Sequence, residues 1–142
     1  MSLDLSLYRR QPVTDDDDQP LYTKNEQGEY VPKMHNEEAF WQNITHNLGT
    51  MASHVKAGRW NLYQLLWRPE EHGFHHLTPE YVRAVGEGYR ELAAHEAKYS
   101  QYNAENGWGL YEHFCPWVGR YADFIAALPE SELTEYEIYA SR

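Results

Sequence analysis

The stretch Ala39–Val55 reads AFWQNITHNLGTMASHV and carries no formally charged side chain. Because 24% of the whole chain is Asp, Glu, Lys or Arg, an uncharged run of this length would arise by chance in about 1% of cases. Placed at 100° per residue, its apolar residues fall on one stripe of a helix: Phe40, Ile44, Leu48, Met51 and Val55. The pattern predicts a helix over about residues 37–57, with Asn36 as its N-cap and Gly58 just past its end.

The polar flank of this predicted helix consists of amides, hydroxyls and imidazoles. Asn43, Asn47, Thr50 and His54 lie beside the apolar stripe, and His46 lies one step further round. A helix flank that faces water normally carries Lys or Glu instead. The pattern therefore indicates a flank that faces other protein or a polar ligand.

The rest of the chain predicts an α+β fold, with three main helices packed on a small antiparallel sheet in a single domain, 1–142. The sheet is formed by the N- and C-terminal strands plus a hairpin. Alternation predicts terminal strands, turn residues predict the hairpin, and 3.6-residue spacing predicts the helices. The expected strands are 2–9, 21–24, 29–31 and one from 135 to the C-terminus. The other two main helices are expected at 78–98 and 110–128, and a short piece of one or two helical turns is expected at 60–67.

The net charge of -10 argues against direct binding of nucleic acid, which needs basic surface to neutralise phosphate. The acidity is consistent with solubility, or with a surface that binds a basic protein partner. Asp15–Asp18 supply four of the charges, and their mutual repulsion predicts a mobile loop over about residues 11–19. A second acidic tract, with Glu130, Glu132, Glu135 and Glu137, could share an edge of the sheet with the first.

Cys115 is the only cysteine, so no disulfide can form within the chain. That usage predicts a cytoplasmic protein. We find no basic segment followed by an apolar segment at the N-terminus, and no apolar run approaches the ~18 residues of a membrane span. The sequence thus predicts neither secretion nor insertion into a membrane.

Three motifs together resemble a family of small bacterial and phage-encoded proteins of unknown function. They are NITHNLGTMA at residues 43–52, LWRPEE at 66–71 and NGWGLYE at 106–112, and the pair Ser141-Arg142 also fits the pattern. The resemblance covers about residues 40–142. It implies a cytoplasmic single-domain protein of bacterial or phage origin, and it brings no activity or catalytic assignment. The histidine-rich HGFHH at 72–76 and the acidic insert before Leu21 lie outside the pattern.

The first candidate site combines the polar flank of residues 43–54 with the NGWG segment. Amides and imidazoles can orient a polar ligand, Trp108 can stack on it, and Arg68 can bind a carboxylate or phosphate. The alternative is a structural network, in which Asn and His side chains cap loops and Arg68 pairs with Glu70, Glu71 or Glu112. The predicted ligand-binding residues are Asn43, His46, Asn47, His54, Arg68, Trp108 and Tyr111.

Two other kinds of site receive less support from the residues. His72, His75 and His76 lie close together, but no CxxC or HExxH spacing accompanies them, so we expect no native metal site and no cofactor. An enzyme would use His46 or His54 as a base, oriented by Glu70 or Glu112. Its nucleophile would have to be Cys115, Ser53 or Thr50, and no nucleophile elbow or phosphate-binding loop is present.

Overall fold

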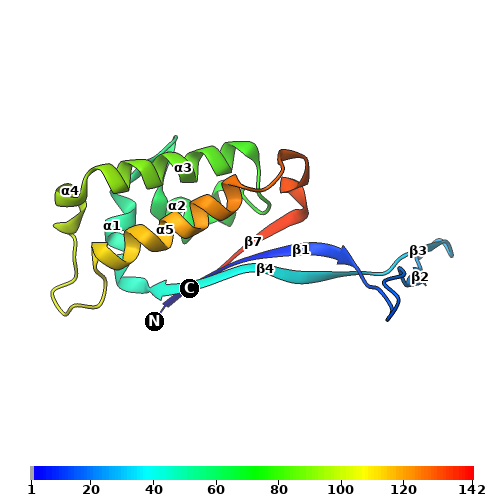
Figure 1. Ribbon diagram of the computed structural model, residues 1–142. Coiled ribbons are helices and arrows are strands. Elements are labelled where there is room, and N and C mark those ends of the chain that lie inside the picture. Colours follow the sequence, from blue (N-terminus) through cyan, green and yellow to red (C-terminus); the bar gives the residue numbers. More distant parts are fainter. Residues whose placement is uncertain (1) are drawn as a thin grey trace.

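A three-stranded antiparallel sheet forms one layer of the structure, a computed structural model that describes residues 2–142 (Figure 1). β1 (Ser2–Pro12) lies between β4 (Met34–Thr45) and β7 (Tyr136–Ser141). Leu5 of β1 is opposite Gln42 on one side and Ala140 on the other. The predicted α+β class and the predicted pairing of the terminal strands are therefore confirmed.

The helices cover one face of this sheet and leave the other face open (Figure 1). Leu3, Leu5 and Leu7 alternate along β1 with all three side chains fully buried under the helical layer, as period-two patterning predicts. The layer consists of α1 (Gly49–Ser53), α2 (Leu62–Leu66), α3 (Pro79–Ala94), α4 (Glu96–Ser100) and α5 (Tyr111–Ala126). It also holds the short 3-10 helices η1 (His46–Leu48), η2 (Pro69–His72) and η3 (Glu130–Glu135) and the short paired strands β5 (Lys56–Ala57) and β6 (Trp60–Asn61).

The helix predicted for residues 37–57 is wrong over its first half. Residues 34–45 form the strand β4, which pairs with β1 from Ser2↔Thr45 to Pro12↔Met34. Asn36 is therefore a strand residue opposite Arg10 and caps no helix. Only η1 and the short α1 are helical in this stretch.

A two-stranded ribbon projects from the body beyond the helices (Figure 1). The distal parts of β1 and β4 form its stem, and β2 (Tyr22–Lys24) and β3 (Tyr30–Pro32) form its outer end as a separate sheet. The predicted hairpin is thus present, with Gly28 at φ 79° in its turn. β1 runs on to Pro12, past its predicted end. Asp15–Asp18 lie in the loop before β2, and the mobility of this loop stays a prediction.

The two long helices begin close to their predicted starts, but α3 ends at Ala94, before the predicted residue 98, and the separate helix α4 begins at Glu96. The Thr78 side chain accepts a hydrogen bond from the Tyr81 backbone N–H at 3.1 Å, and Pro79 occupies the first helical position of α3. α5 contains Pro116 in its first turns and ends at Ala126. Within residues 2–142, no helix combines the length and the apolar character needed to cross a bilayer.

Gly86 and Gly88 of α3 give a matched test of how closely this helix packs against Ala57 of β5 and Leu62 of α2. A Cβ on Gly88 would lie 2.8 Å from Cβ of Ala57 and 2.5 Å from Cδ2 of Leu62, whereas a Cβ on Gly86 would meet only the end of Arg90, at 3.4 Å. We expect Gly88→Ala to lower the free energy of unfolding by about 1–3 kcal/mol through overpacking. Gly86→Ala should raise it by up to about 1 kcal/mol, because Ala favours the helix. Urea denaturation measures both, and equal effects would contradict this packing.

Buried tyrosines should make the fold sensitive to alkaline pH. The hydroxyls of Tyr81 and Tyr121 lie 2.9 Å apart in the core, and burial raises the pKa of both. Burial and a hydrogen bond to Glu91 raise the pKa of Tyr99 from 10.0 to about 12. The folded chain therefore holds these protons more tightly than the unfolded chain.

The contribution of these protonated tyrosines to the free energy of unfolding is complete below about pH 10 and is lost as the pH rises toward about 12. We expect the free energy of unfolding to fall over this window, and Tyr99→Phe to make the decline shallower. Urea denaturation at a series of pH values measures it. A free energy that stays constant up to about pH 12 would contradict the assignment.

Candidate functional site

The candidate site lies at the corner where β4 ends and α1 begins. β4 stops at Thr45, η1 turns the chain, and Leu48 anchors the turn in the core with 1% of its side chain exposed. His46 and Asn47 stand before Leu48 and are exposed to solvent. The change from strand to helix therefore places an imidazole and an amide side by side on the surface.

Two open grooves meet at this corner. One has a volume of about 460 Å³ and is lined by His46, Asn47, Gly49, Thr50, Ser53 and Tyr63. The other has a volume of about 780 Å³ and is lined by Ser2, Asn43, Thr45, His46, Asn47 and Trp108. His46 and Asn47 line both grooves, so they form the ridge between them. Volumes of this size are typical of sites for small molecules.

The loop that carries Trp108 is fastened to the corner by its backbone. The Asn47 side chain donates a hydrogen bond to the Trp108 carbonyl oxygen at 2.8 Å, and the Trp108 N–H donates to the Asn106 side chain at 2.9 Å. Gly109 has φ 129°, and a Cβ there would lie 3.1 Å from Cβ of Asn47. Glycine thus permits the close approach, while the Trp108 side chain stays 70% exposed.

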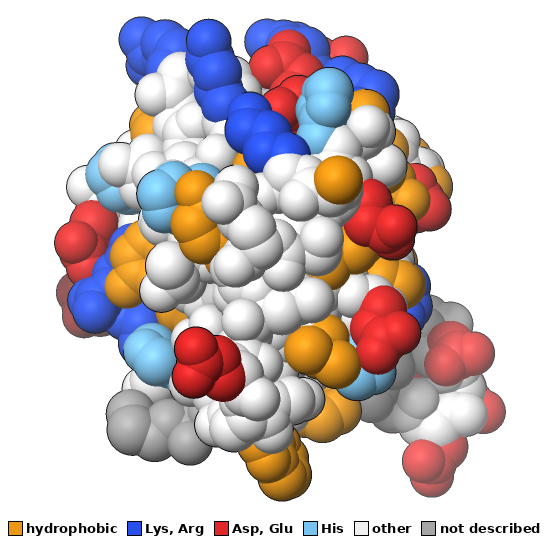
Figure 2. Space-filling model, turned by 90° about the vertical axis from the view of Figure 1, so that its left-hand side faces the viewer, with side chains coloured by type: hydrophobic (Ala, Val, Ile, Leu, Met, Phe, Trp, Pro, Cys, Tyr) orange, Lys and Arg blue, Asp and Glu red, His pale blue; other side chains and the backbone are white. Residues whose placement is uncertain are grey.

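The first groove is built on the contact between α1 and α2. A Cβ on Gly49 would lie 3.3 Å from the Tyr63 ring, so glycine lets this ring pack closely on α1. Ser53 donates its hydroxyl hydrogen to the Thr50 carbonyl at 2.6 Å. Of the residues that the structure describes, no Asp, Glu, Lys or Arg lines either groove. Figure 2 views the molecule from this side, and the middle of that face is largely uncharged.

Four of the predicted ligand-binding residues come together in the second groove: Asn43, His46, Asn47 and Trp108. Asn43 is held in place from the sheet, because its side chain donates to Asp4 at 2.9 Å. Asn43 and Asn47 reach the groove from a strand and a turn, not from one helix face. Asn43 and Asn47 therefore lie close together as predicted, but the meeting of the strand with the turn brings them there, and not a shared helix face.

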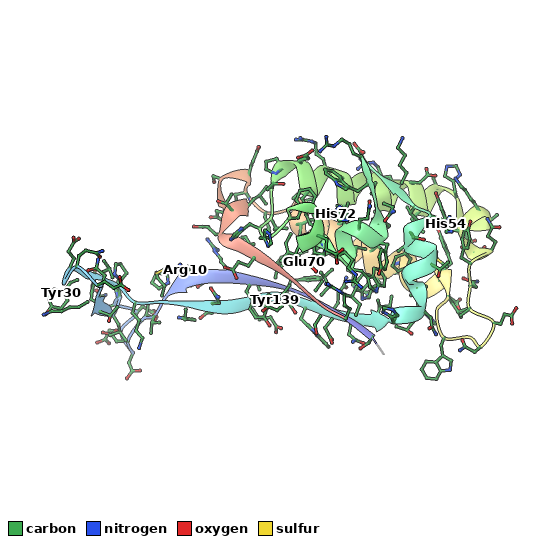
Figure 3. All side chains as sticks on the ribbon, turned by 180° about the vertical axis from the view of Figure 1, so that it is seen from behind. Arg10, Tyr30, His54, Glu70, His72 and Tyr139 are labelled. Carbon is green, nitrogen blue, oxygen red and sulfur yellow. The ribbon has the colours of Figure 1, made fainter. Side chains whose placement is uncertain are left out.

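Three other predicted residues lie outside both grooves. His54 stacks on Tyr102 with ring centroids 4.2 Å apart, and Figure 3 labels it at the end of α1. The buried Tyr111 donates its hydroxyl hydrogen to the Leu92 carbonyl at 2.7 Å. Arg68 borders the first groove only through Tyr63, whose hydroxyl accepts from it at 3.4 Å.

Arg68 belongs to an ion-pair network in the LWRPEE segment. Its guanidinium binds Glu71 at 2.9 Å. The hydrogen bond to Tyr63, and to a smaller extent the one to Glu71, raises the pKa of Arg68. Arg142 binds Glu70 at 2.5 Å and donates to the Trp67 carbonyl at 3.0 Å. The structural alternative for Arg68, pairing with Glu71, is therefore the arrangement found.

The arrangement at His46 does not complete a catalytic triad. His46 shares a groove with Thr50 and Ser53, but Glu70 is paired with Arg142 and Glu112 does not line the groove. Without an orienting carboxylate, the usual second partner of a histidine base is missing. Across residues 2–142, no three His, Cys, Asp or Glu side chains converge in a way that could hold a metal ion.

Sequence reasoning missed three residues that line the grooves: Ser2, Thr45 and Tyr63. Ser2 reaches the site because it pairs with Thr45 across the sheet. Tyr63 reaches it because α2 packs on α1, and the glycine at position 49 was the one local signal of a close approach.

Comparison of the chain with protein-family models, with curated proteins and with solved structures finds no match.

Proposed function

We propose that the protein binds a small, polar, uncharged ligand at the corner formed by the end of β4, η1 and α1. The observation that carries this proposal is the ridge of His46 and Asn47, which offers an imidazole and an amide to two adjoining grooves. Amides and imidazoles both donate and accept hydrogen bonds. They can therefore orient a ligand without carrying a permanent charge.

The exposed Trp108 supports a ligand that has a flat or apolar face. Its backbone is fixed by Asn47 and Asn106, so the indole is presented from a loop already held in place. Less ordering is then needed when a ligand binds. Stacking on an aromatic side chain contributes about 1–3 kcal/mol per base in nucleic-acid complexes, and comparable flat groups can use the same surface.

The charge distribution favours a neutral ligand over an anionic one. Within residues 2–142, no Lys or Arg belongs to the lining of the grooves, and Arg68, a cation near the first groove, is paired with Glu71 at 2.9 Å. The chain also carries a net charge of -10, which repels anions at long range. A hydroxyl-rich or amide-bearing molecule with a planar face fits these constraints.

The test is a binding screen with neutral nucleosides, monosaccharides and short amides, followed by protein-detected NMR. We expect a binder to shift the resonances of His46, Asn47 and the Trp108 indole. Trp108→Ala and His46→Ala should each weaken binding at least tenfold, which corresponds to about 1.4 kcal/mol. His54→Ala is the matched control, because His54 lies outside both grooves, and it should change affinity less than twofold.

Two results would contradict the proposal. One is a screen in which no compound shifts these resonances. The other is a binder whose affinity is unchanged by both Trp108→Ala and His46→Ala. Turnover of a bound compound that requires His46 would instead favour an enzyme using His46 with Ser53 or Thr50.

A further inference from the structure

The open face of the three-stranded sheet carries an aromatic centre. Trp41 and Tyr139 lie on either side of Ser6 in the register of β4, β1 and β7. Their side chains are 55% and 62% exposed, while Ser6 between them is only 7% exposed. The Tyr8 ring lies edge-on to Tyr139 at 5.9 Å. Aromatic side chains collected on an uncovered face are typical of an interaction surface.

Carboxylates border this aromatic centre. Tyr8 pairs with Glu38 on one side and with Glu137 on the other, so both carboxylates belong to the row next to Trp41 and Tyr139. Asp4 lies in the row on the opposite side and accepts a hydrogen bond from the Trp41 indole at 3.3 Å. Arg10 follows Tyr8 by two residues and so shares this face of β1 beyond the carboxylates. The surface, here called the open sheet face, therefore combines an aromatic middle with an acidic rim formed by Asp4, Glu38 and Glu137.

The projecting ribbon is a second surface that its own chain leaves uncovered. Every hydrogen bond that the structure records for residues 13–33 has its partner within that segment. An isolated hairpin of this kind is at best marginally stable in water. The segment and its stem nevertheless carry four of the chain's large exposed apolar side chains: Leu21, Tyr22, Tyr30 and Met34.

One face of the ribbon's outer end is aromatic and cationic. Tyr22 pairs with Pro32, and Lys24 pairs with Tyr30. Since paired residues and residues two apart share a face of a sheet, these four side chains lie together. Lys24 Nζ lies 5.2 Å from the centre of the Tyr30 ring. This ribbon face complements the open sheet face, because it has aromatic rings for the centre and a cation for the acidic rim.

The ribbon cannot reach the open sheet face of its own chain. The same strands, β1 and β4, form both the sheet and the ribbon's stem, so folding back would break their pairing. Figure 3 shows Tyr30 near the outer end of the ribbon and Tyr139 back on the sheet. A second copy has no such restriction. Two copies related by a twofold axis could each lay a ribbon across the other's open sheet face.

We propose that the protein self-associates by reciprocal ribbon exchange, with the Tyr22–Lys24–Tyr30–Pro32 face of each ribbon packed on the Trp41–Tyr139 face of the other copy. The pairing buries both surfaces that the single chain leaves open. It also places Lys24 near the carboxylates of the rim. A closed dimer follows, because the same two patches are used in both directions.

Analytical ultracentrifugation of the full chain at physiological salt tests the proposal. We expect a species of twice the 16.8 kDa of one chain. A ribbon variant, Tyr22→Ser with Tyr30→Ser, and a face variant, Trp41→Ser with Tyr139→Ser, should each raise the dimer dissociation constant at least tenfold. These side chains are exposed, and circular dichroism checks that both variants fold. Trp108→Ala removes an equally exposed aromatic outside both surfaces and should leave the dimer intact.

Mixing the two variants distinguishes ribbon-on-face packing from other arrangements. The ribbon variant keeps an intact face and the face variant keeps an intact ribbon, so their mixture should form a mixed dimer through one of the two contacts. A wild-type chain that stays monomeric at high concentration would overturn the proposal. So would a dimer that survives the ribbon variant, or a mixture that stays monomeric.

Glu137→Lys, which reverses a rim charge on the surface, should weaken the dimer without touching the aromatic centre.

Discussion

The double pairing of β1 is the constraint on which the rest of the structure depends. Its leucines at positions 3, 5 and 7 are fully buried, and its two edges bind β4 and β7. A strand with one apolar face fixes its register, because a slip of one residue would turn all three leucines to solvent. That register sets Ser2 opposite Thr45 and so ends β4 at the corner where His46 and Asn47 emerge.

The strand pairing of residues 34–45 also shows why the helix predicted for residues 37–57 was wrong over its first half. Phe40 and Ile44 are four residues apart, a spacing that fits one stripe of a helix and equally one face of a strand. The residue between them on the strand's inner face is Gln42, an amide that hides the alternation. Its side chain is buried, and the amide nitrogen donates to the Trp117 carbonyl at 2.9 Å, so a contact with α5, distant in sequence, satisfies the donor of this amide. The aromatic and β-branched content of residues 40–45 was the local signal for a strand.

The elements that depend on local chemistry were predictable. The cap of α3, the turn at Gly28 and the alternation of the two terminal strands each have a short-range cause, and each appears near its predicted place. The site was predictable in part for a related reason. Asn47 and Trp108 were grouped by their chemistry, and the fold joins them by a hydrogen bond across 61 residues. His54 was grouped with them by its place on the predicted helix flank and Tyr111 by its place after the NGWG segment, and stacking on Tyr102 and burial hold these two residues elsewhere.

The LWRPEE segment shows how charged residues can serve the fold and, by doing so, define where a ligand can bind. Arg68 and Arg142 supply two positive charges, and Glu70 and Glu71 supply two negative charges, so the network is formally neutral. Arg142 follows β7 directly and binds the Trp67 carbonyl, which joins the end of the sheet to the end of α2. These guanidinium groups are therefore committed to carboxylates and to backbone. Among residues 2–142, the side chains that line the two grooves carry no Asp, Glu, Lys or Arg, and the imidazole and amide of the ridge are the groups that can select a partner.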